Sequence, residues 1–268
     1  MFRIFKGVQG ERTFRAASIS ALAILIIFFV GIILSLLTYT NWKTFWEALT
    51  SKEILFAIEL SLATATIVTI FSMLIAVPVA YAISKAKFFG KDIIDSLLDL
   101  PIVISPIALG AALLVFFGTP VGTAINNNIR FVFAVPGIIL AQITVVSALA
   151  IRLLKSTFDS IDERYEQVGR TLGCSKPEAF VRIVVPMAKD GLISSCILTW
   201  ARAVGEFGAT VTLAGATAMK TETLPIAIYL SLASAEIEKA VAVIFILVII
   251  SILALLIIRK IVGKRHII

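Results

Sequence analysis

Long apolar stretches separated by short polar segments dominate the pattern along this 268-residue chain. A helix needs about 20 mostly apolar residues to cross a hydrocarbon layer ~30 Å thick. Five stretches reach that length, namely residues 16–39, 56–84, 93–117, 131–154 and 240–258. The pattern therefore predicts an all-α membrane protein.

A sixth stretch, residues 191–215, is interrupted by Arg202 and Glu206. Each charge costs about 2.5–3.5 kcal/mol near the centre of a membrane helix, so hydropathy alone leaves this span open. Counting it favours a regular topology, because lysines and arginines are retained on the cytoplasmic side. With six spans and both termini inside, eighteen basic residues are internal and five are external. The internal ones are Arg3, Lys6, Arg12, Arg15, Lys85, Lys87, Lys91, Arg152, Lys155, Arg164, Arg170, Lys176, Arg182, Lys189, Arg259, Lys260, Lys264 and Arg265, and the external ones are Lys43, Lys52, Arg130, Lys220 and Lys239.

Composition agrees with this topology, since 59% of residues are apolar, 15% are charged and the mean hydropathy is +1.03. Such a chain exposes more apolar surface than a soluble core could bury. The net charge of +7 then reflects topology rather than an attraction for cargo. We expect one membrane domain, residues 1–268, in the cytoplasmic membrane. Its first span is longer than the apolar core of a signal peptide and is expected to remain uncleaved. The apolar segment 224–235 is too short to span, which predicts a re-entrant or surface-lying helix at the outer mouth.

The predicted inner loop, residues 155–186, has the pattern of two helices joined by a glycine turn. Apolar residues recur at steps of three and four, which is typical of one helix face. They are Phe158, Ile161, Tyr165, Val168 and Leu172. Ser160 followed by Glu163 has the spacing of a capping box, which predicts the start of the first helix. Gly173 is expected to end it in the left-handed conformation.

A second capping box is predicted at Ser175-Lys176-Pro177-Glu178, with a helix that ends at Pro186. An amphipathic hairpin could lie on lipid headgroups. Four acidic side chains on its polar face would be poor partners for an anionic leaflet, so docking onto a soluble protein is favoured. These are Asp159, Asp162, Glu163 and Glu166.

The run from Gln167 to Gly173, followed after nine residues by Ile183-Val184-Val185-Pro186, resembles the "EAA" loop of binding-protein-dependent ABC importer permeases. The spacing is the same, although Gln-Val-Gly replaces the EAA triplet and Val185 replaces the final leucine. The resemblance implies a type I importer permease fold and alternating access. It also implies a dimeric core, expected to be a homodimer with a heterodimer left open, and two ATPase subunits that hold MgATP. The implied ATPase-coupling residues are Tyr165, Glu166, Gln167, Val168, Gly169, Arg170, Leu172 and Gly173.

Residues 100–106, 201–210 and 223–229 resemble permeases for molybdate, tungstate and sulfate. This resemblance implies an oxyanion cargo, with molybdate or tungstate preferred and sulfate or thiosulfate as the alternative. An extracytoplasmic oxyanion-binding protein is the further partner implied.

Several residues in these segments are candidates for a gate or translocation path, and each has a structural alternative. Two prolines could form a hinge or a tolerated kink, two glycines could line a path or allow helix packing, and a charged pair four residues apart could be purely structural. They are Pro101, Pro106, Arg202, Gly205, Glu206 and Gly208.

Other classes of function are disfavoured by missing motifs. The chain has no G-x-x-x-x-G-K-[ST] phosphate loop, and His266 is its only histidine. We therefore expect no enzyme activity, metal site, cofactor or nucleic-acid partner in this chain. An ion-coupled secondary transporter would be expected to show broken helices in paired halves. A non-transporting scaffold would leave the proline-broken spans unexplained.

Overall fold

The computed structural model of the chain describes residues 2–39, 42–85 and 89–263. Within these ranges the regular elements are helices, and no strand occurs. Lys87, Lys264, Arg265 and His266, which entered the charge count and the motif search, lie outside the described residues. The predicted all-α architecture is therefore confirmed for the described part of the chain.

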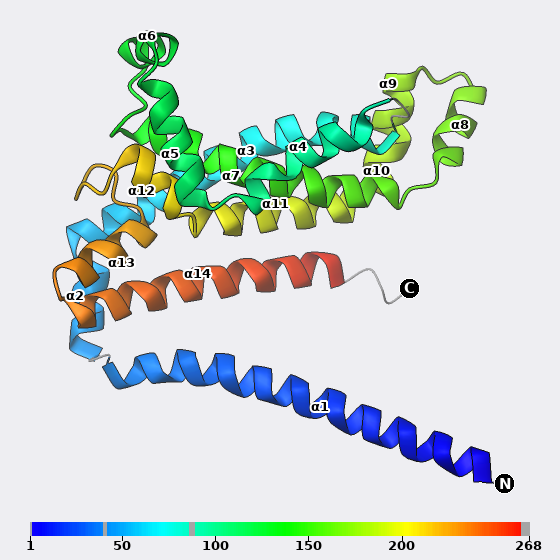
Figure 1. Cartoon of the computed structure of the whole chain (residues 1–268), viewed down its shortest axis with the longest axis horizontal. Helices are drawn as coiled ribbons and strands as arrows, with labels where there is room; N and C mark the ends of the chain where they lie inside the picture. The colour runs from blue at the N-terminus through cyan, green and yellow to red at the C-terminus, as the bar shows by residue number, and fades with distance from the viewer. Residues whose placement is uncertain (1, 40–41, 86–88, 264–268) are drawn as a thin grey trace.

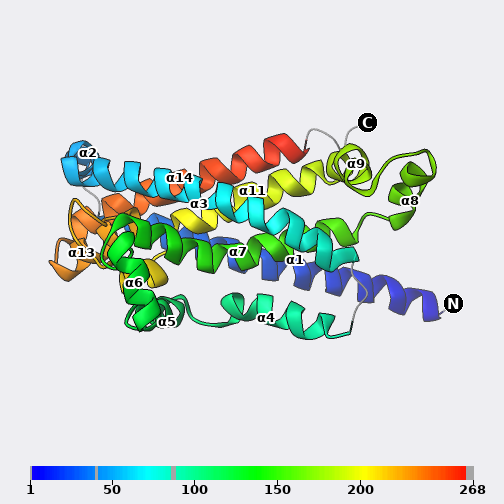
Figure 2. The same cartoon turned by 90° about the horizontal axis from the view of Figure 1, so that it is seen from above.

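Three helices form the centre of the molecule: α3 (Lys52–Lys85), α7 (Val135–Asp159) and α11 (Lys189–Val204). They run side by side along the long axis, and α14 (Ile237–Gly263) lies next to them (Figures 1 and 2). Val68, Val146 and Val204, with two small alanines, form the buried cluster that joins α3, α7 and α11. Small residues let membrane helices approach closely, which suits a bundle that packs without a hydrophobic driving force.

Four helices of the described part are long and apolar enough to cross a membrane: Thr13–Leu36 of α1 (Phe2–Leu36), α3, α7 and Ile237–Ile257 of α14. A fifth is obtained if α4 (Lys91–Val103) and α5 (Pro106–Phe117) are counted together. The predicted span 191–215 is split into α11, which has 16 residues, and α12 (Gly208–Ala214). The six-span topology stays a prediction.

The predicted third span, residues 93–117, is broken into two helices, because α4 and α5 meet at 105°. Ser105 has ψ 135°, the extended conformation favoured for a residue that precedes proline. Pro106 then begins α5, where its missing N–H group leaves no bond unmade. Pro101, by contrast, lies inside α4. Of the two candidate hinges, only Pro106 therefore coincides with a break.

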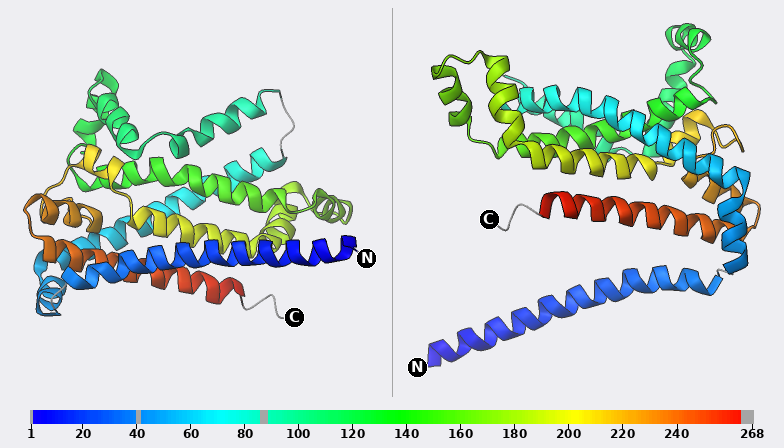
Figure 3. Two further views of the ribbon diagram at one scale, coloured as in Figure 1. Left: turned by 60° about the horizontal axis from the view of Figure 1, so that its bottom comes forward. Right: turned by 180° about the vertical axis from the view of Figure 1, so that it is seen from behind.

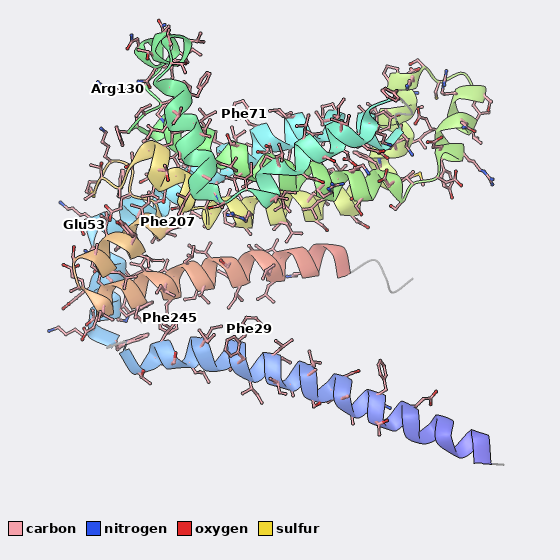
Figure 4. All side chains as sticks on the ribbon, viewed as in Figure 1. Phe29, Glu53, Phe71, Arg130, Phe207 and Phe245 are labelled. Atoms are coloured by element: carbon pink, nitrogen blue, oxygen red, sulfur yellow. The ribbon has the colours of Figure 1, made fainter. Side chains whose placement is uncertain are left out.

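Helix α5 leaves the direction of the bundle and leads into α6 (Pro120–Asn128), near which Arg130 is labelled (Figures 1 and 4). Helix α1 lies apart from the bundle on the side of α14 (Figure 3), and its apolar window is not buried at all. It reaches α3 through the 3-10 turn η1 (Leu37–Tyr39) and α2 (Trp42–Thr50). The rings of Trp42, Phe45 and Trp46 cluster on α2, an arrangement typical of a membrane interface.

The apolar segment predicted at 224–235 forms α13 (Leu224–Ala233), and of the two predicted alternatives its buried start favours the re-entrant helix over the surface-lying one. Leu224 and Ala227 are fully buried in a cluster with Ile54 of α3 and Val243 of α14. The start of α13 is held by α3, since the Leu224 N–H donates to Ser61 Oγ at 2.7 Å and Ser61 is buried. The first half of the short helix is thus internal, whereas Tyr229 and Leu232 in its second half are exposed.

Replacing Ser61 by alanine leaves the buried Leu224 N–H without its acceptor. An unsatisfied buried donor costs about 1–3 kcal/mol, so we expect Ser61→Ala to lower the thermal midpoint of the detergent-solubilised protein. Ser251→Ala is the control, because the Ser251 hydroxyl donates only to Leu247 O of its own helix at 2.8 Å. Equal midpoints for Ser61→Ala and Ser251→Ala would contradict this role of Ser61.

Candidate functional site

A helical hairpin protrudes at one end of the bundle (Figures 1 and 2), formed by α8 (Glu163–Thr171), α9 (Lys176–Ala179), the π-helical turn η2 (Phe180–Val184) and α10 (Val185–Met187). The capping box predicted at Ser160 is wrong. Helix α7 continues to Asp159, and the Ser160 hydroxyl donates back to Thr157 O at 2.7 Å. The N-cap of α8 is Asp162, whose Oδ1 accepts from the Arg164 N–H at 2.9 Å.

The turn at Gly173 matches the prediction, with φ at +98°. The Gly173 N–H donates to Arg170 O and the Cys174 N–H to Gly169 O, both at 3.1 Å. These are the two bonds of a Schellman motif, which satisfies the last carbonyl groups of α8. A Cβ at Gly173 would meet no atom within 4 Å, so only the backbone conformation demands glycine there.

The second predicted capping box is confirmed at Ser175 and Glu178. Glu178 Oε2 accepts from the Ser175 N–H at 2.9 Å, and Ser175 Oγ accepts from the Glu178 N–H at 3.4 Å. The bond from the Ser175 backbone N–H, followed by that from its hydroxyl, lowers the pKa of Glu178 below its ordinary value of 4.5. The carboxylate is therefore charged at neutral pH, and its contribution to folding is lost only as the pH falls through this lowered pKa.

The predicted helix end at Pro186 is wrong, because Pro186 lies within α10. The preceding turn is π-helical, and the Val185 N–H reaches back five residues to Phe180 O. A π turn adds one residue and changes the bonding register. It thereby accommodates a proline that has no N–H group to donate.

The apolar stripe predicted on one helix is divided between a buried part and an exposed part. Phe158 and Ile161 are buried beneath the hairpin, where the Phe158 ring lies 5.8 Å from that of Tyr81 and 6.2 Å from that of Phe180. Three members, two on α8 and one at its C-cap, remain exposed, with accessible fractions of 54% for Tyr165, 57% for Val168 and 81% for Leu172. Gln167 and Arg170 are exposed as well.

The strip of α8 next to these exposed residues is attached to the rest of the protein. Gly169 is buried, and a Cβ there would overlap the Ile183 side chain of η2. Glu166 Oε2 accepts from the Tyr81 hydroxyl of α3 at 2.8 Å. Lys85 Nζ, at the end of α3, donates to Ile161 O at 3.0 Å. The hairpin is therefore anchored along one strip of α8 and exposes apolar side chains beside that strip.

Sequence reasoning missed a network of charges at the same end of the bundle. Asp95 and Asp99 of α4 both pair with Arg152 of α7. Arg152 Nε donates to Asp99 Oδ1 at 2.8 Å, and Lys155 Nζ contacts Asp95 at 3.8 Å and Asp159 at 3.0 Å. Asp159 in turn accepts from Ser84 of α3 at 2.6 Å. A signal was present in the sequence, because Asp95 and Asp99 are four residues apart and Arg152 and Lys155 are three apart. Each spacing places two charges on one face of a helix.

The second candidate region is the break between α11 and α12. Arg202 Nη1 lies 2.6 Å from Glu206 Oε2, and Glu206 Oε1 accepts from the Ala209 N–H at 3.1 Å. A Cβ at Gly208 would lie 3.1 Å from Pro106 Cβ and Ile107 N, so α12 begins directly against the start of α5. A Cβ at Gly205 would meet no atom closer than 3.8 Å. The close approach predicted for both glycines thus holds only for Gly208.

The structure brings together most of the predicted gate residues. Pro106, Glu206 and Gly208 lie where the two helix breaks meet, and Arg202 is attached to them through Glu206. Pro101 lies within α4, away from the break. The coupling residues form a separate region on the hairpin, which is linked to the gate residues only through the long helices.

Comparisons with known proteins agree with this arrangement. Residues 72–267 match the family of binding-protein-dependent transport system inner membrane components. The chain is 31% identical to a probable molybdenum ABC transporter permease protein of Haloferax volcanii over 246 residues, covering 92% of this chain and 90% of that protein. It is 33% identical to the molybdenum transport system permease protein ModB of Escherichia coli K12 over 65% of this chain and 77% of ModB. It is 37% identical to the molybdate/tungstate transport system permease protein WtpB of Thermococcus kodakarensis, over 59% of this chain and 60% of WtpB.

The fold is shared with a chain of the crystallised bacterial alginate ABC transporter in complex with its alginate-bound periplasmic protein. The TM-score is 0.77 at 16% sequence identity, over 99% of this chain and 98% of that one. The predicted type I importer permease fold is thereby confirmed. A family match over most of the chain, together with several apolar spans, identifies a multi-pass protein of the cell membrane and a transport subunit rather than an enzyme. The chain belongs to the family of binding-protein-dependent transport system inner membrane components, the permease subunits of ABC importers.

Proposed function

We propose that this chain forms the translocation path of an ABC importer whose cargo is molybdate or tungstate. Relatives that cover much of the chain bear names that specify molybdenum, molybdate or tungstate transport. The proposed complex holds two copies of this chain, two ATPase subunits that bind MgATP, and an extracytoplasmic binding protein that delivers the oxyanion. Its proposed topology has six spans with both termini inside, counting α4–α5 and α11–α12 as one broken span each.

The observation that carries this proposal is the exposed apolar stripe on α8. Tyr165, Val168 and the C-cap residue Leu172 lie at steps of three and four residues, beside the residues that attach α8 to η2 and α3. An amphipathic helix with such anchors suits the groove of a soluble partner. In this proposal the partner is the ATPase subunit, and the hairpin transmits its movement to the spans.

Contacts at the base of the hairpin provide a route for that movement. Tyr81 and Lys85 connect the hairpin to α3, while Asp159 connects α7 to α3 through Ser84. Arg152 extends the connection to α4. A displacement of α8 would therefore move α3, α7 and α4 together. Through α4 it would reach the break where α4 meets α5.

The cargo is tested by reconstituting the chain with its ATPase and binding protein in proteoliposomes. We expect ATP-dependent uptake of molybdate and tungstate that requires the binding protein, with calorimetry showing that the binding protein prefers these anions to sulfate. Uptake of sulfate with no uptake of molybdate or tungstate would contradict the cargo assignment. Uptake driven by an ion gradient without ATP would contradict the importer.

Docking through the stripe is tested with Leu172→Glu. The side chain is 81% exposed, so the fold tolerates the change, but a carboxylate buried in an apolar interface is unpaired. We expect the affinity for the ATPase subunit to fall about 30-fold or more, as for the loss of an interface hot spot. Thr171→Glu is the matched control on a neighbouring face of α8. Equal affinities of both variants for the ATPase, measured by pull-down titration, would argue against docking through the stripe.

Coupling through the turn is tested with Gly173→Val. A β-branched residue at φ +98° is strained by about 1–3 kcal/mol, whereas asparagine tolerates that conformation. We expect Gly173→Val to lower molybdate uptake per ATP hydrolysed severalfold and Gly173→Asn to remain near the unmodified protein. A Cβ at this position touches no other atom within 4 Å. Steric overlap at the Cβ would therefore not explain a lower uptake per ATP in Gly173→Val than in Gly173→Asn. The same transport ratio in both variants would exclude a role for the turn.

A further inference from the structure

Arg202 is a basic side chain at the middle depth of the bundle. The residues that follow it, Ala203 and Val204, are buried against Val68, near the middle of α3, and Val146, near the middle of α7. The side chain of Arg202 nevertheless keeps 38% of its surface exposed. A charged group at this depth is strongly disfavoured against hydrocarbon, and in membrane proteins it faces a polar partner or a water-filled cavity.

Glu206, the partner of Arg202, is in a different environment. Its side chain is 1% exposed, one oxygen contacts Arg202 Nη1 at 2.6 Å, and the other accepts from the Ala209 N–H at 3.1 Å. Both oxygens are thus engaged, and the carboxylate is held in place by the backbone of α12. The anion is therefore enclosed, whereas the cation remains accessible to a further partner.

Irregular backbone next to the pair also indicates a polar environment. The α11–α12 break lies against the α4–α5 break, since a Cβ at Gly208 would be 3.1 Å from Ile107 N and Pro106 Cβ. Non-helical backbone at membrane depth is tolerated only where it is covered by protein or lines an aqueous space. Ser105 and Gly205, one residue in each break, are both exposed. Two adjacent breaks with accessible residues are therefore consistent with the wall of a path.

We infer that Arg202 binds the tetrahedral oxyanion during its passage through the permease and that Glu206 holds the guanidinium in position. This inference rests on the proposed function. A guanidinium presents five N–H donors in a planar fork that matches the oxygens of an oxyanion. Glu206 engages one nitrogen and offsets the charge. A conduction site must attract its ion yet release it, which a partly neutralised arginine achieves better than an isolated one.

The test uses the complete complex of permease, ATPase and binding protein in proteoliposomes, with molybdate as the probe. The variant is Arg202→Gln combined with Glu206→Gln, which removes both charges and leaves an amide oxygen that can accept from the Ala209 N–H. The matched control is Lys43→Gln combined with Glu47→Gln, a pair with the same i,i+4 spacing on α2 that is largely exposed. Three quantities are measured: assembly, stimulation of ATP hydrolysis by the loaded binding protein, and molybdate uptake.

We expect the double variant at Arg202 and Glu206 to assemble and to hydrolyse ATP on stimulation, but to take up molybdate about tenfold more slowly or worse. That factor is the size expected for losing one charge-assisted hydrogen bond. The control should match the unmodified complex in all three quantities. Unchanged uptake would overturn the inference. If the unmodified complex took up no molybdate, the proposed function itself would fail, independently of Arg202.

Arg202→Lys keeps the result decisive if the double variant does not assemble. Lysine retains the ion pair with Glu206 but lacks the planar fork. We expect it to assemble, to show normal stimulation of ATP hydrolysis, and to lower molybdate uptake severalfold. Normal uptake by Arg202→Lys would overturn the binding role. Equal losses of uptake and of stimulated hydrolysis would also overturn it, because they would indicate a structural pair.

Discussion

The constraint on which this structure depends is that a bilayer offers no hydrogen bonds to an interrupted helix. Each break in a span must therefore be satisfied by the protein itself. At the α11–α12 break the Gly205 N–H donates to Ala201 O and the Ala209 N–H to Glu206. At the start of α13 a serine from α3 accepts the first free amide. At the start of α5 the first residue is a proline, which has no amide hydrogen to satisfy.

The hairpin end of the bundle and the junction of the helix breaks are held together by different kinds of contact. The hairpin end combines a buried apolar cluster around Phe158 with charged and polar contacts that connect α8, α3, α7 and α4. The breaks, by contrast, depend on small residues in close contact, with Gly208 against α5 and Gly110 of α5 against Ala209. In the proposed importer, the hairpin end would receive the movement of the ATPase. The packed junction between α5 and α12 would respond to that movement.

Local signals in the sequence predicted local structure well. Gly173 and the Ser175 capping box are specified by neighbours within a few residues, and both are present. The Ser160 box failed because α7 continues past it and Asp162 offers a competing cap. The helix end at Pro186 failed because a π turn can absorb a proline. Contacts between residues 53, 85 and 163 positions apart, such as Arg152 with Asp99, Tyr81 with Glu166 and Leu224 with Ser61, were beyond a single sequence because only the fold brings them together.

Helix α4 has no buried residue, and it is attached to α7 by the ion pairs of Asp95 and Asp99 together with the apolar contact of Leu98. The attraction within an ion pair falls as the effective dielectric constant around it rises. The three side chains of these pairs keep between 25% and 40% of their surface exposed, so solvent already reaches them. Dissolved salt would therefore weaken the attachment of α4 to α7, while the buried apolar contacts between α3, α7 and α11 would remain.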